Sequence, residues 1–553
     1  MSSKALRIIP LGGVGTFGMN CTVLESGNSM IVVDAGLKVP QGNLPGVDLI
    51  LPDFSYVIDN ARRVAGIFLT HGHDDHIGGL PYLLREVQVP VYGTALTLAL
   101  VRERLAAAAR DGAQNDILMR QILFTESVKC GPFIVEAVRV SHSIPDGAAL
   151  IIRTPAGTVV HSGDFKMDPT PLNGHLTDED RLTRVGDEGV LCLLCDSTNA
   201  DRAGTTPSEK DVSEVLVRII DGAPGRVFVA TFASHIHRIQ SVLDAAHRAG
   251  RKVVLEGRRM IANCELAAAM GYLRYPPGTL ASADRIEGTD GKVVFLVTGT
   301  QGEPMSALSR IVKGEHPLVG VRRGDTVIFS SRIIPGNELT TGQMIDELYR
   351  RGAEVYYQDP PRVHASGHGS AEEILRMIRA VRPRIFIPIH GDYRQMAACS
   401  RLGREAGIAE GCAFLMEAGH VLELRPEGAG LADPVNAGQI LVDGDLMTAV
   451  GGSLLKDRRR LAREGVVLVA VSLPRDGERA AFEPDVHSVG VAPDLISPEL
   501  DAEAARTVTV LLSDRDGSSS LEELKENIRL AARSVYRKAI QKRPHVVVVA
   551  LEE

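Results

Sequence analysis

An apolar run that passes directly into a cluster of ionisable side chains constrains this chain more than any other feature. Residues 64–70, "VAGIFLT", are typical of a buried strand, and "HGHDDH" at 71–76 follows with three histidines and two aspartates. Such side chains repel or desolvate one another in a folded protein unless a cation organises them. Imidazole and carboxylate together suit borderline metals such as Zn²⁺ or Mn²⁺. The predicted metal ligands from this loop are His71, His73, Asp75 and His76.

Three more candidate ligands follow strand-like runs elsewhere in the chain. His142 lies in "VRVSHSIPD", Asp164 in "VVHSGDFKMD" and His390 in "RIFIPIHGDY". The Asp164 carboxylate is suited to bridging two metals. Each residue alone could equally be an ordinary polar loop residue that forms hydrogen bonds within the protein. Together, in this order, the three predict a site for two divalent ions, Zn or Mn.

Composition limits the function classes. The 553 residues carry a formal net charge of −8, so a polyanion would have to bind through a local patch or a metal site. The basic run "DRRRLAR" at 457–463 is typical of a solvated face. Seven cysteines, including the strand-like pair Cys192 and Cys195, favour a reducing compartment over a disulfide framework. With neither a signal-peptide pattern nor an apolar run of about 18 residues, we expect a soluble cytoplasmic protein without a membrane span.

The chain divides by its secondary-structure rhythm. Residues 1–207 alternate short β-type runs with helical patterns such as 95–110, which is an α/β layout. From Ser208, a predicted helix N-cap, strands and helices alternate up to 372, which indicates a parallel sheet. Residues 373–430 return to a helix, a strand and histidine chemistry, so 208–372 is predicted to be a domain inserted into the first.

The remaining residues are predicted to form a linker and a small C-terminal domain. The Gly/Pro-rich passage at 424–439 indicates a linker, placed at 431–452. Residues 453–553 read as a small α+β module with one long helix, "LEELKENIRLAARSVYRKAIQKR", and apolar strand-like runs that include "ARTVTVLLSD" at 505–514.

The stretch "GGVGTFG" near the start imitates a dinucleotide-binding fingerprint. Gly13, Gly15 and Gly18 have the required spacing, with Asp34 downstream. A helix must open at the third glycine to hold a pyrophosphate, but "MNCTVLESGNSMIVVDAG" alternates and turns like a β-hairpin. We therefore expect no dinucleotide here. The glycines more readily let the loop pass close to another part of the protein, such as the active site.

The motifs together resemble a known family. "THGHDDHIGG", "SHS", "SGDFK" and "PIHGD" resemble the metallo-β-lactamase superfamily, and "LLCDSTNA", "TFASHIHRIQ", "TGTQGEPMSALSR", "SSRIIPGNE" and "VHASGHGS" resemble its β-CASP nucleases, most closely the bacterial ribonuclease J family. The resemblance spans residues 1 to about 450. It implies an α/β fold: a metallo-β-lactamase αββα sandwich with an inserted β-CASP parallel-sheet domain and a small α+β C-terminal domain.

The resemblance also implies residue roles. One metal would take His71, His73, His142 and Asp164, and the other would take Asp75, His76, Asp164 and His390. The nucleophile would be oriented by Asp75 or Asp164, and Asp196 would support His368, the implied general acid. An additional structural cation, Ca or Mn, is implied, and its candidate ligands are Asp48 and Asp443.

The resemblance further implies a metal-dependent ribonuclease with 5′→3′ exonuclease activity that favours 5′-monophosphate RNA, plus endonuclease activity, in mRNA decay and rRNA maturation. It would hydrolyse phosphodiesters and leave a 5′-phosphate and a 3′-hydroxyl. Gly/Ser-rich loops after strands present N–H and hydroxyl donors to phosphates. The predicted RNA-binding residues are Ser234, Ser331, His364, Ala365, Ser366, Gly367 and His368, with Arg258 and Arg332 as further backbone contacts.

Expected partners are single-stranded RNA, a second or further copies of the chain in a homodimer or homotetramer, and RNA-decay proteins. Three alternatives stay open from the sequence. A β-CASP DNA nuclease would share the whole site, a small-ester hydrolase would share only the metal motif, and a catalytically inactive RNA-decay scaffold would be expected to have lost ligands.

Overall fold

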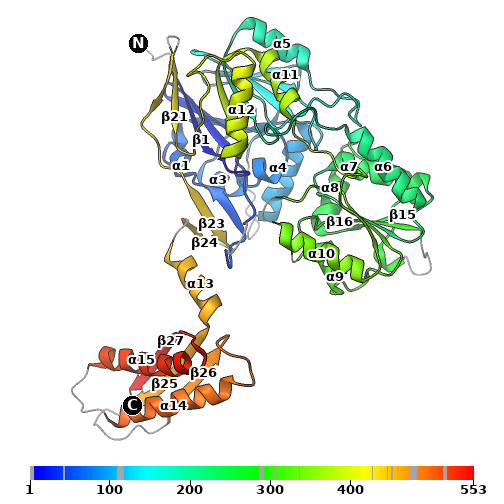
Figure 1. Cartoon of the computed structure of the whole chain (residues 1–553). Helices are drawn as coiled ribbons and strands as arrows, with labels where there is room; N and C mark the ends of the chain where they lie inside the picture. The colour runs from blue at the N-terminus through cyan, green and yellow to red at the C-terminus, as the bar shows by residue number, and fades with distance from the viewer. Residues whose placement is uncertain are drawn as a thin grey trace. The chain divides into compact units, whose positions relative to one another are not determined.

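The structure is a computed structural model that describes residues 5–40, 44–108, 117–285, 292–303, 305–334, 337–425, 428–444, 446–449, 452–473, 483–514 and 520–552. The chain forms two compact units (Figure 1). The catalytic unit comprises Met1–Gln41 and Asp48–Met447, and the C-terminal unit comprises Gly42–Val47 and Thr448–Glu553.

Two facing sheets form the centre of the catalytic unit. The strand order in the first sheet is β22-β21-β1-β3-β4-β6-β7-β8, and in the second β19-β13-β12-β11-β10-β9. The strands of the first sheet are β1 (Leu6–Gly12), β3 (Cys21–Ser26), β4 (Ser29–Val33), β6 (Val64–Phe68), β7 (Val91–Gly93), β8 (Met119–Gln121), β21 (Val421–Arg425) and β22 (Gly428–Ala432). Those of the second are β9 (Ser127–Cys130), β10 (Phe133–Arg139), β11 (Ala148–Thr154), β12 (Gly157–His161), β13 (Val190–Asp196) and β19 (Pro383–Ile389).

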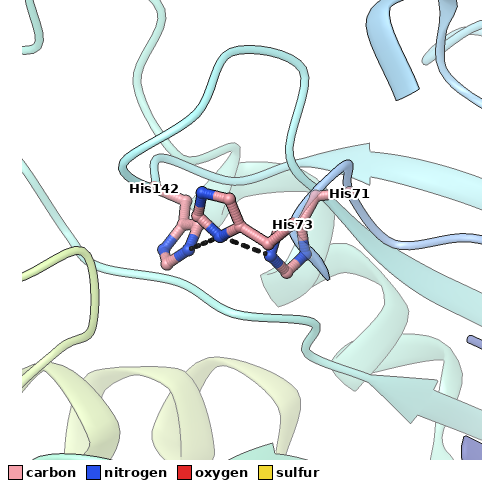
Figure 2. Close-up of side chains that lie close together, drawn as sticks. All are labelled: His71, His73 and His142. Atoms are coloured by element: carbon pink, nitrogen blue, oxygen red, sulfur yellow. Dashed lines mark hydrogen bonds between the residues drawn. The ribbon is translucent and has the colours of Figure 1, made fainter. Parts of the chain in front are cut away.

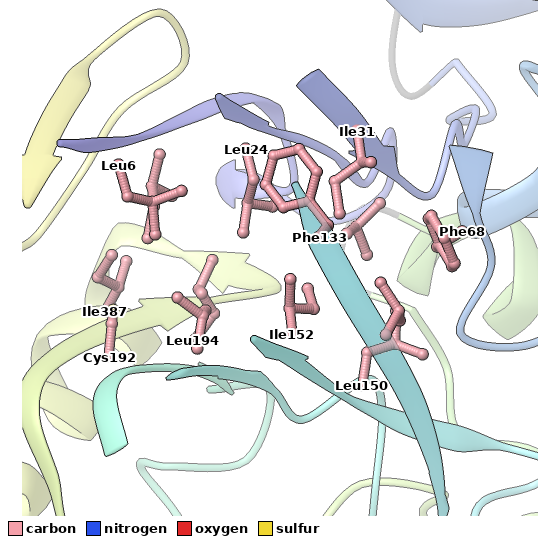
Figure 3. Close-up of a cluster of buried hydrophobic side chains, with 14 of the residues drawn as sticks. Leu6, Leu24, Ile31, Phe68, Phe133, Leu150, Ile152, Cys192, Leu194 and Ile387 are labelled. Carbon is pink, nitrogen blue, oxygen red and sulfur yellow. The ribbon is translucent and has the colours of Figure 1, made fainter. Parts of the chain in front are cut away.

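The two sheets bury an aliphatic core between them. Leu24 and Phe68 of the first sheet face Phe133, Leu150 and Leu194 of the second (Figure 3). Because side chains alternate along a strand, neighbouring residues such as Ile9 point to the opposite face, into a second core under helices. The strands are therefore apolar on both faces, as a four-layer fold requires.

Helices cover both outer faces of this sandwich. Over the first sheet lie α1 (Ser55–Asp59), α3 (Leu80–Glu86) and α4 (Ala95–Ala108). Over the second lie α5 (Glu179–Glu188), α11 (Ala371–Val381) and α12 (Tyr393–Glu405). Of the helix predicted over 95–110, residues 109 and 110 lie outside the described residues. The arrangement confirms the predicted αββα sandwich.

The β-CASP domain is inserted between two neighbouring strands of the second sheet. β13 and β19 pair in parallel, with Val190 opposite Pro383, and the chain between them builds a separate sheet. All its strands are parallel, in the order β15-β16-β14-β17-β18, as predicted. They are β14 (Val227–Ala230), β15 (Lys252–Glu256), β16 (Val293–Val297), β17 (Thr326–Phe329) and β18 (Glu354–Tyr356).

Helices cover both faces of this parallel sheet (Figure 1). One face packs against α6 (Glu209–Gly222), α7 (Ile236–Arg248) and α8 (Arg258–Ala269), and the other against α9 (Ala307–Lys313) and α10 (Glu338–Arg350). Ser208 caps α6 through a capping box with Asp211, which confirms the predicted N-cap.

The segment expected to be a linker is partly strand. β23 (Gln439–Asp443) pairs antiparallel with β5 (Leu49–Pro52), and β24 (Leu446–Ala449) extends that small sheet. β22 also continues the first sheet of the sandwich through Gly428–Ala432. These short strands were not predicted because the Gly and Pro residues of this passage are unfavourable in strands. β22 and β24 lie at sheet edges, where such residues are tolerated, whereas β23 lies between β24 and β5.

The C-terminal unit packs two helices on one face of the sheet β26-β25-β27. Its strands are β25 (Val466–Leu473), β26 (Asp485–Val489) and β27 (His545–Glu552), and its helices are α13 (Ser453–Glu464), α14 (Ser497–Ser513) and α15 (Leu521–Ile540). Residues 505–513, expected to be a strand, belong to α14. Ala504 and Val508 of α14 lie four residues apart in the core, so tertiary packing overrides the β-branched composition.

Candidate active site

The predicted ligands lie on loops at one edge of the sandwich. His71 and its neighbours follow β6, His142 follows β10, Asp164 follows β12, and His390 follows β19. Asp74–Ile77 form the one-turn helix α2, which places Asp75 and His76 one turn beyond His73. The register of β10 with β11 and of β11 with β12 brings the ends of β10 and β12 to the same edge, so residues far apart in sequence meet there.

Three histidines form the first candidate ligand group (Figure 2). His73 Nδ1 lies 3.0 Å from His71 Nε2 and 3.2 Å from His142 Nε2. A ring nitrogen donates at most one hydrogen bond, so three nitrogens converging on one point leave lone pairs unmatched. A cation placed among them would satisfy all three.

Asp75, His76, Asp164 and His390 form the second candidate group. The Asp164 Oδ2 atom lies 3.2 Å from His76 Nε2 and 3.4 Å from His390 Nε2. The same oxygen lies 3.6 Å from His71 Nε2 and 3.8 Å from His142 Nε2, in the first group. Asp164 therefore stands between both groups, as a bridging carboxylate would.

Fixed acceptors orient four of the five histidines. The outer Nδ1 of His142 faces the Gly367 carbonyl oxygen at 2.7 Å, and that of His76 faces Asp34 Oδ2 at 2.7 Å. These oxygens only accept, so each Nδ1 carries the proton and each inner Nε2 keeps a lone pair directed at the site.

The other two histidines reach the same tautomer through threonines. Thr70 donates its hydroxyl proton to Asp34 and so accepts from His71 Nδ1 at 3.1 Å. Thr198 donates to Asp196 Oδ1 and accepts from His390 Nδ1 at 2.7 Å. Inward lone pairs on an N/O donor set are what two divalent ions need, so these residues fit a dinuclear centre.

Burial and carboxylates divide the histidines by pKa. Burial disfavours the charged form of His71, His73 and His142, and lowers the pKa of His73 to about 4. Burial acts the same way on His390, but Asp164 and the hydrogen bond to Asp75 outweigh it and raise its pKa to about 9. The carboxylates thus stabilise positive charge at the second group, and either protons or metal ions can supply that charge.

His368 and Asp196 form a pair beside both groups. Asp196 ends β13, and His368 Nδ1 lies 2.8 Å from its Oδ2 atom. Burial opposes a charge on His368, but Asp196 outweighs it and raises the pKa of the imidazole. His368 Nδ1 also lies 3.9 Å from Asp164 Oδ2, so this imidazole stands next to the candidate metal centre.

The loop that carries His368 packs directly on the metal ligands. A Cβ on Gly367 would lie 2.7 Å from His142 Cε1, so only glycine allows this approach. Asn199 Nδ2 donates to Ser366 Oγ at 2.9 Å and to the His368 carbonyl at 3.0 Å. The segment through which the chain leaves the inserted domain and re-enters the sandwich therefore packs next to the predicted metal ligands.

The predicted RNA-binding residues are only partly satisfied by protein contacts. Ser331 Oγ and His364 Nδ1 are buried and have no hydrogen-bond partner among the described residues. Ala365 is buried, and Ser234 is half-buried in the loop before α7. Buried polar atoms are normally paired, so these two groups remain available to a ligand, and their role in RNA binding stays a prediction.

The two predicted arginines differ in placement. Arg332 Nη1 lies 3.5 Å from Asn199 Oδ1, next to the His368 loop. Arg258 is exposed at the first position of α8. Its neighbour Arg259, which the sequence did not single out, donates to Asp74 Oδ2 at 2.8 Å.

Asp74 is the residue of "HGHDDH" that belongs to neither candidate ligand group. Its Oδ1 atom pairs with Arg104 of α4, and its Oδ2 atom pairs with Arg259 of α8. Tyr272 of the inserted domain likewise donates to Asp146 of the sandwich. These contacts join the two domains on the side of the metal motif.

Asp48 and Asp443 lie beside each other at the ends of β5 and β23. Val442 pairs with Leu49, and Asp48 Oδ2 accepts from Gly444 N at 2.8 Å. Among the described residues, no group of three or more metal-ligating side chains includes them. Their role as cation ligands stays a prediction.

The glycine-rich loop serves the site, as the sequence predicted, and opens a hairpin rather than a helix. β3 and β4 form the hairpin, and β2 (Val14–Gly15) pairs with β20 (Gly391–Asp392). Gly13 has φ +75°, and its carbonyl accepts from His390 N at 2.6 Å. The loop fixes the backbone of His390, which itself has φ +53°.

Sequence reasoning missed the residues that orient the ligands. Asn20 and Asp34 lie outside the quoted metal and β-CASP motifs, and Thr70 and Thr198 lie within "THGHDDHIGG" and "LLCDSTNA" without having been singled out. Asn20 donates to the Asp75 carbonyl at 3.0 Å, and Asp34 accepts from Thr70 N at 2.8 Å. The only available signal was a polar residue at the end of an apolar strand, as in "MIVVDAG".

Comparison with known families agrees with this architecture. The metallo-β-lactamase superfamily matches residues 14–188, and the ribonuclease J β-CASP domain matches 224–348. The Zn-dependent metallo-hydrolase RNA specificity domain matches 362–410, and the ribonuclease J C-terminal domain matches 453–553.

Individual relatives cover the whole chain. Ribonuclease J2 of Bacillus subtilis (strain 168) is 37% identical over 556 residues, which is 100% of this chain and 99% of the relative. Ribonuclease J of Thermus thermophilus is 39% identical and covers 99% of this chain and 95% of the relative. A solved structure from Enterococcus faecalis V583, of a protein of unknown function, has a TM-score of 0.53 and 18% identity, and covers 76% of this chain and 100% of that one. It supports the fold alone.

The αββα sandwich, the inserted parallel sheet and the gathered histidines and aspartates define a metallo-hydrolase of the β-CASP class. More narrowly, the chain belongs to the ribonuclease J family and is a metal-dependent ribonuclease. Within the described part of the chain, no helix combines the length and apolar character needed to cross a membrane.

Proposed function

We propose that this protein is a 5′→3′ exoribonuclease that favours 5′-monophosphate RNA and also cuts internally, in mRNA decay and rRNA maturation. The observation that carries the proposal is the pair of orphaned buried groups, Ser331 Oγ and His364 Nδ1, in two segments whose residues Arg332 and Ser366 both contact Asn199. Leaving buried polar groups unmatched costs about 1–3 kcal/mol each, so a bound phosphate is a better account of them than an empty space.

The character of His364 supports a phosphate pocket built from neutral donors. Burial lowers the pKa of His364 well below its usual value, and the charge of Arg238 acts in the same direction. A neutral imidazole and a serine hydroxyl donate hydrogen bonds to phosphate oxygens without a charge that would hold any polyanion indiscriminately.

The proposed ligands for two Zn or Mn ions are His71, His73, His142 and Asp164 for one, and Asp75, His76, Asp164 and His390 for the other. When bound, such a pair of ions supplies a nucleophile at neutral pH and stabilises the in-line displacement at phosphorus. The inward lone pairs of the histidines support this assignment.

The protein's own residues then handle the proton and the orientation. His368, kept protonated by Asp196 at 2.8 Å, is placed to give its proton to the leaving 3′ oxygen. Asp75, which faces His390 Nε2 at 3.1 Å, is placed to orient the nucleophile. The cut would leave a 3′-hydroxyl on one product and a 5′-phosphate on the other.

One RNA assay tests the proposal. The RNA is labelled at its 3′ end and internally, and carries either a 5′-monophosphate or a 5′-triphosphate, with a DNA of the same sequence alongside. We expect mononucleotides mainly from the monophosphate RNA, and no cleavage by His76→Ala. Ser331→Ala should reduce the preference for monophosphate, whereas Ser309→Ala, a buried serine in α9, should not. Equal degradation of the DNA or no preference between 5′ ends would refute the proposal.

The setting and assembly follow from the same family. We propose a cytoplasmic protein, because all seven cysteines are unpaired and six are buried, as suits a reducing compartment. We also propose a homodimer or homotetramer with contacts to RNA-decay proteins. Light scattering of the full chain and of a chain ending near residue 450 tests the assembly, and an unchanged monomeric mass in both would contradict it.

A further inference from the structure

Basic side chains gather at one end of the C-terminal unit. Residues 453–464 and 529–543 together carry eleven basic and two acidic residues, whereas 483–514 carry one basic and seven acidic residues. The first two segments are α13 and the second half of α15 with the turn before β27. The positive charge of this domain is therefore concentrated in one part of it. We name the basic end the C-terminal basic surface; it comprises Lys456, Arg460, Arg463, Arg533, Arg537, Lys538, Lys542 and Arg543.

α15 carries a cationic stripe whose second half has no acidic partner on the helix. Lys525, Arg529, Arg533 and Arg537 are spaced by four residues, which places them on one helix face. Lys525 and Arg529 pair with glutamates three residues earlier, Glu522 and Glu526. The corresponding positions before Arg533 and Arg537 are Leu530 and Ser534. Like charges at this spacing repel, so the unpaired half of the stripe lowers the stability of helix α15.

The three segments of the surface contact one another. Lys542 Nζ donates to the Arg463 carbonyl at 2.7 Å, and Arg543 N donates to Glu464 Oε2 at 2.8 Å. Arg533 is half-buried and donates to the Pro544 carbonyl at 3.2 Å. Burial is the main cause that lowers its pKa, and the charges of Arg460 and Arg529 act in the same direction, which places these cations close to Arg533. The basic residues thus form one surface rather than scattered charges.

The helix dipole explains only part of this pattern. Arg537 and Lys538 lie in the last turn of α15, where cations stabilise a helix. The cations of α13 that approach them, such as Arg460, gain nothing from that dipole. Glu464, the acid nearest to the turn, already accepts from the Arg543 backbone. A bound polyanion would relieve the repulsion that remains.

We propose that the C-terminal basic surface binds the phosphate backbone of single-stranded RNA outside the catalytic site. The inference rests on RNA being the substrate and adds a second RNA contact on a separate compact unit. A local cluster of cations attracts phosphates even in a chain whose net charge is −8. The contact should be independent of sequence and sensitive to salt, because it involves charge and no groups suited to reading bases.

The test compares two double variants of the full chain. Arg460→Gln/Arg537→Gln removes two exposed cations from the surface, and the matched control Arg506→Gln/Lys525→Gln removes two cations from other parts of the same unit. The binding probe is a cleavage-resistant 2′-O-methyl RNA of about 40 nucleotides, followed by fluorescence anisotropy. The catalytic probe is the rate on a 5′-monophosphate RNA of about six nucleotides.

We expect the surface variant to bind the long RNA roughly 5- to 20-fold more weakly and to lower the salt slope by about 1.4, for two lost contacts. The control should change the affinity less than twofold, and all three proteins should cleave the short RNA within twofold of one another. Equal long-RNA affinity in both variants would overturn the proposal. So would full competition by polyglutamate at equal charge concentration, which would indicate an acidic protein as the partner. If the wild-type chain did not cleave the short RNA, that result would instead refute the proposed function.

Discussion

The catalytic unit contains two buried polar clusters that differ in how their charge is balanced. The candidate metal centre gathers five histidines and two aspartates whose ring nitrogens present lone pairs to one another. The second cluster, which we name the buried ionic network, comprises Lys166, Asp168, Glu209 and Arg238. Lys166 Nζ lies 3.1 Å from Asp168 Oδ2, and Arg238 Nη2 lies 2.8 Å from Glu209 Oε2.

The difference lies in how the carboxylate charge of each cluster is balanced. Two cations and two anions cancel in the buried ionic network, and Arg238 also donates to the Ser330 and Val363 carbonyls at 3.1 Å. The ligand groups of the metal centre consist of His and Asp alone, with no Lys or Arg to balance the carboxylates. The network therefore holds the β-CASP domain and its loops together, while the metal centre needs ions from solution.

The largest effect should come from breaking the metal centre. His76→Ala removes a lone pair that faces Asp164 and is expected to lower the cleavage rate by at least about 10³-fold, which corresponds to about 4 kcal/mol of lost transition-state stabilisation. The fold should persist because the surrounding core is apolar. Cleavage rate and far-UV circular dichroism check both parts, and a variant that retains the wild-type rate in metal-free buffer would contradict the dinuclear assignment.

Breaking the buried ionic network should act on stability instead. Arg238→Met leaves Glu209 buried without its closest cation and is expected to lower the free energy of unfolding by about 3–5 kcal/mol. Urea denaturation measures this, and the double variant Arg238→Met/Glu209→Gln should recover part of the loss. If Arg238→Met lost bound metal while keeping its stability, the two clusters would not be separable in this way.

A smaller effect should follow from loosening the support of a ligand. Asp34 accepts from His76 Nδ1 at 2.7 Å and has φ +60°, a backbone conformation that asparagine also tolerates. Asp34→Asn should therefore keep the fold but weaken metal affinity by about 10- to 100-fold. Titrating activity with Mn²⁺ or Zn²⁺ measures the shift, with Asp53→Asn, a loop aspartate bonded to Ser55, as the control. An unchanged titration curve would remove Asp34 from the account.

The smallest effect is expected at Asp74. Its side chain is 34% exposed and that of Arg259 is 69% exposed, so solvent screens the ion pair between the domains. Asp74→Asn should change the free energy of unfolding by less than about 1 kcal/mol. A thermal melt checks this. A loss as large as that of Arg238→Met would show that the contact between the domains depends on Asp74 more than its exposure indicates.

The sequence predicted the sandwich, the inserted parallel sheet and the residues that gather at the candidate metal centre. The sandwich was implied by the family resemblance and the inserted sheet by the alternation of strands and helices, whereas the ligands could be predicted because strands that end in His and Asp place those side chains at one edge of a sheet. The supporting Asp34, Thr70 and Thr198 escaped prediction because their roles depend on contacts across the fold. The buried ionic network escaped for the same reason, since Lys166 and Arg238 look like ordinary surface cations in sequence. Two elements were predicted wrongly: part of helix α14 was expected to be a strand, and strand β23 was expected to belong to a linker. In both, tertiary packing outweighs the preference of the local composition.

The most direct test counts divalent ions per chain by mass spectrometry, together with RNA cleavage, in the wild-type protein, Asp164→Asn and Arg238→Met. The account predicts two ions per chain and cleavage in the wild-type protein, and loss of ions and cleavage in Asp164→Asn. It predicts that folded Arg238→Met keeps both ions. Cleavage by a wild-type protein stripped of ions, or two retained ions in Asp164→Asn, would contradict the claim that the histidine cluster is completed by metal.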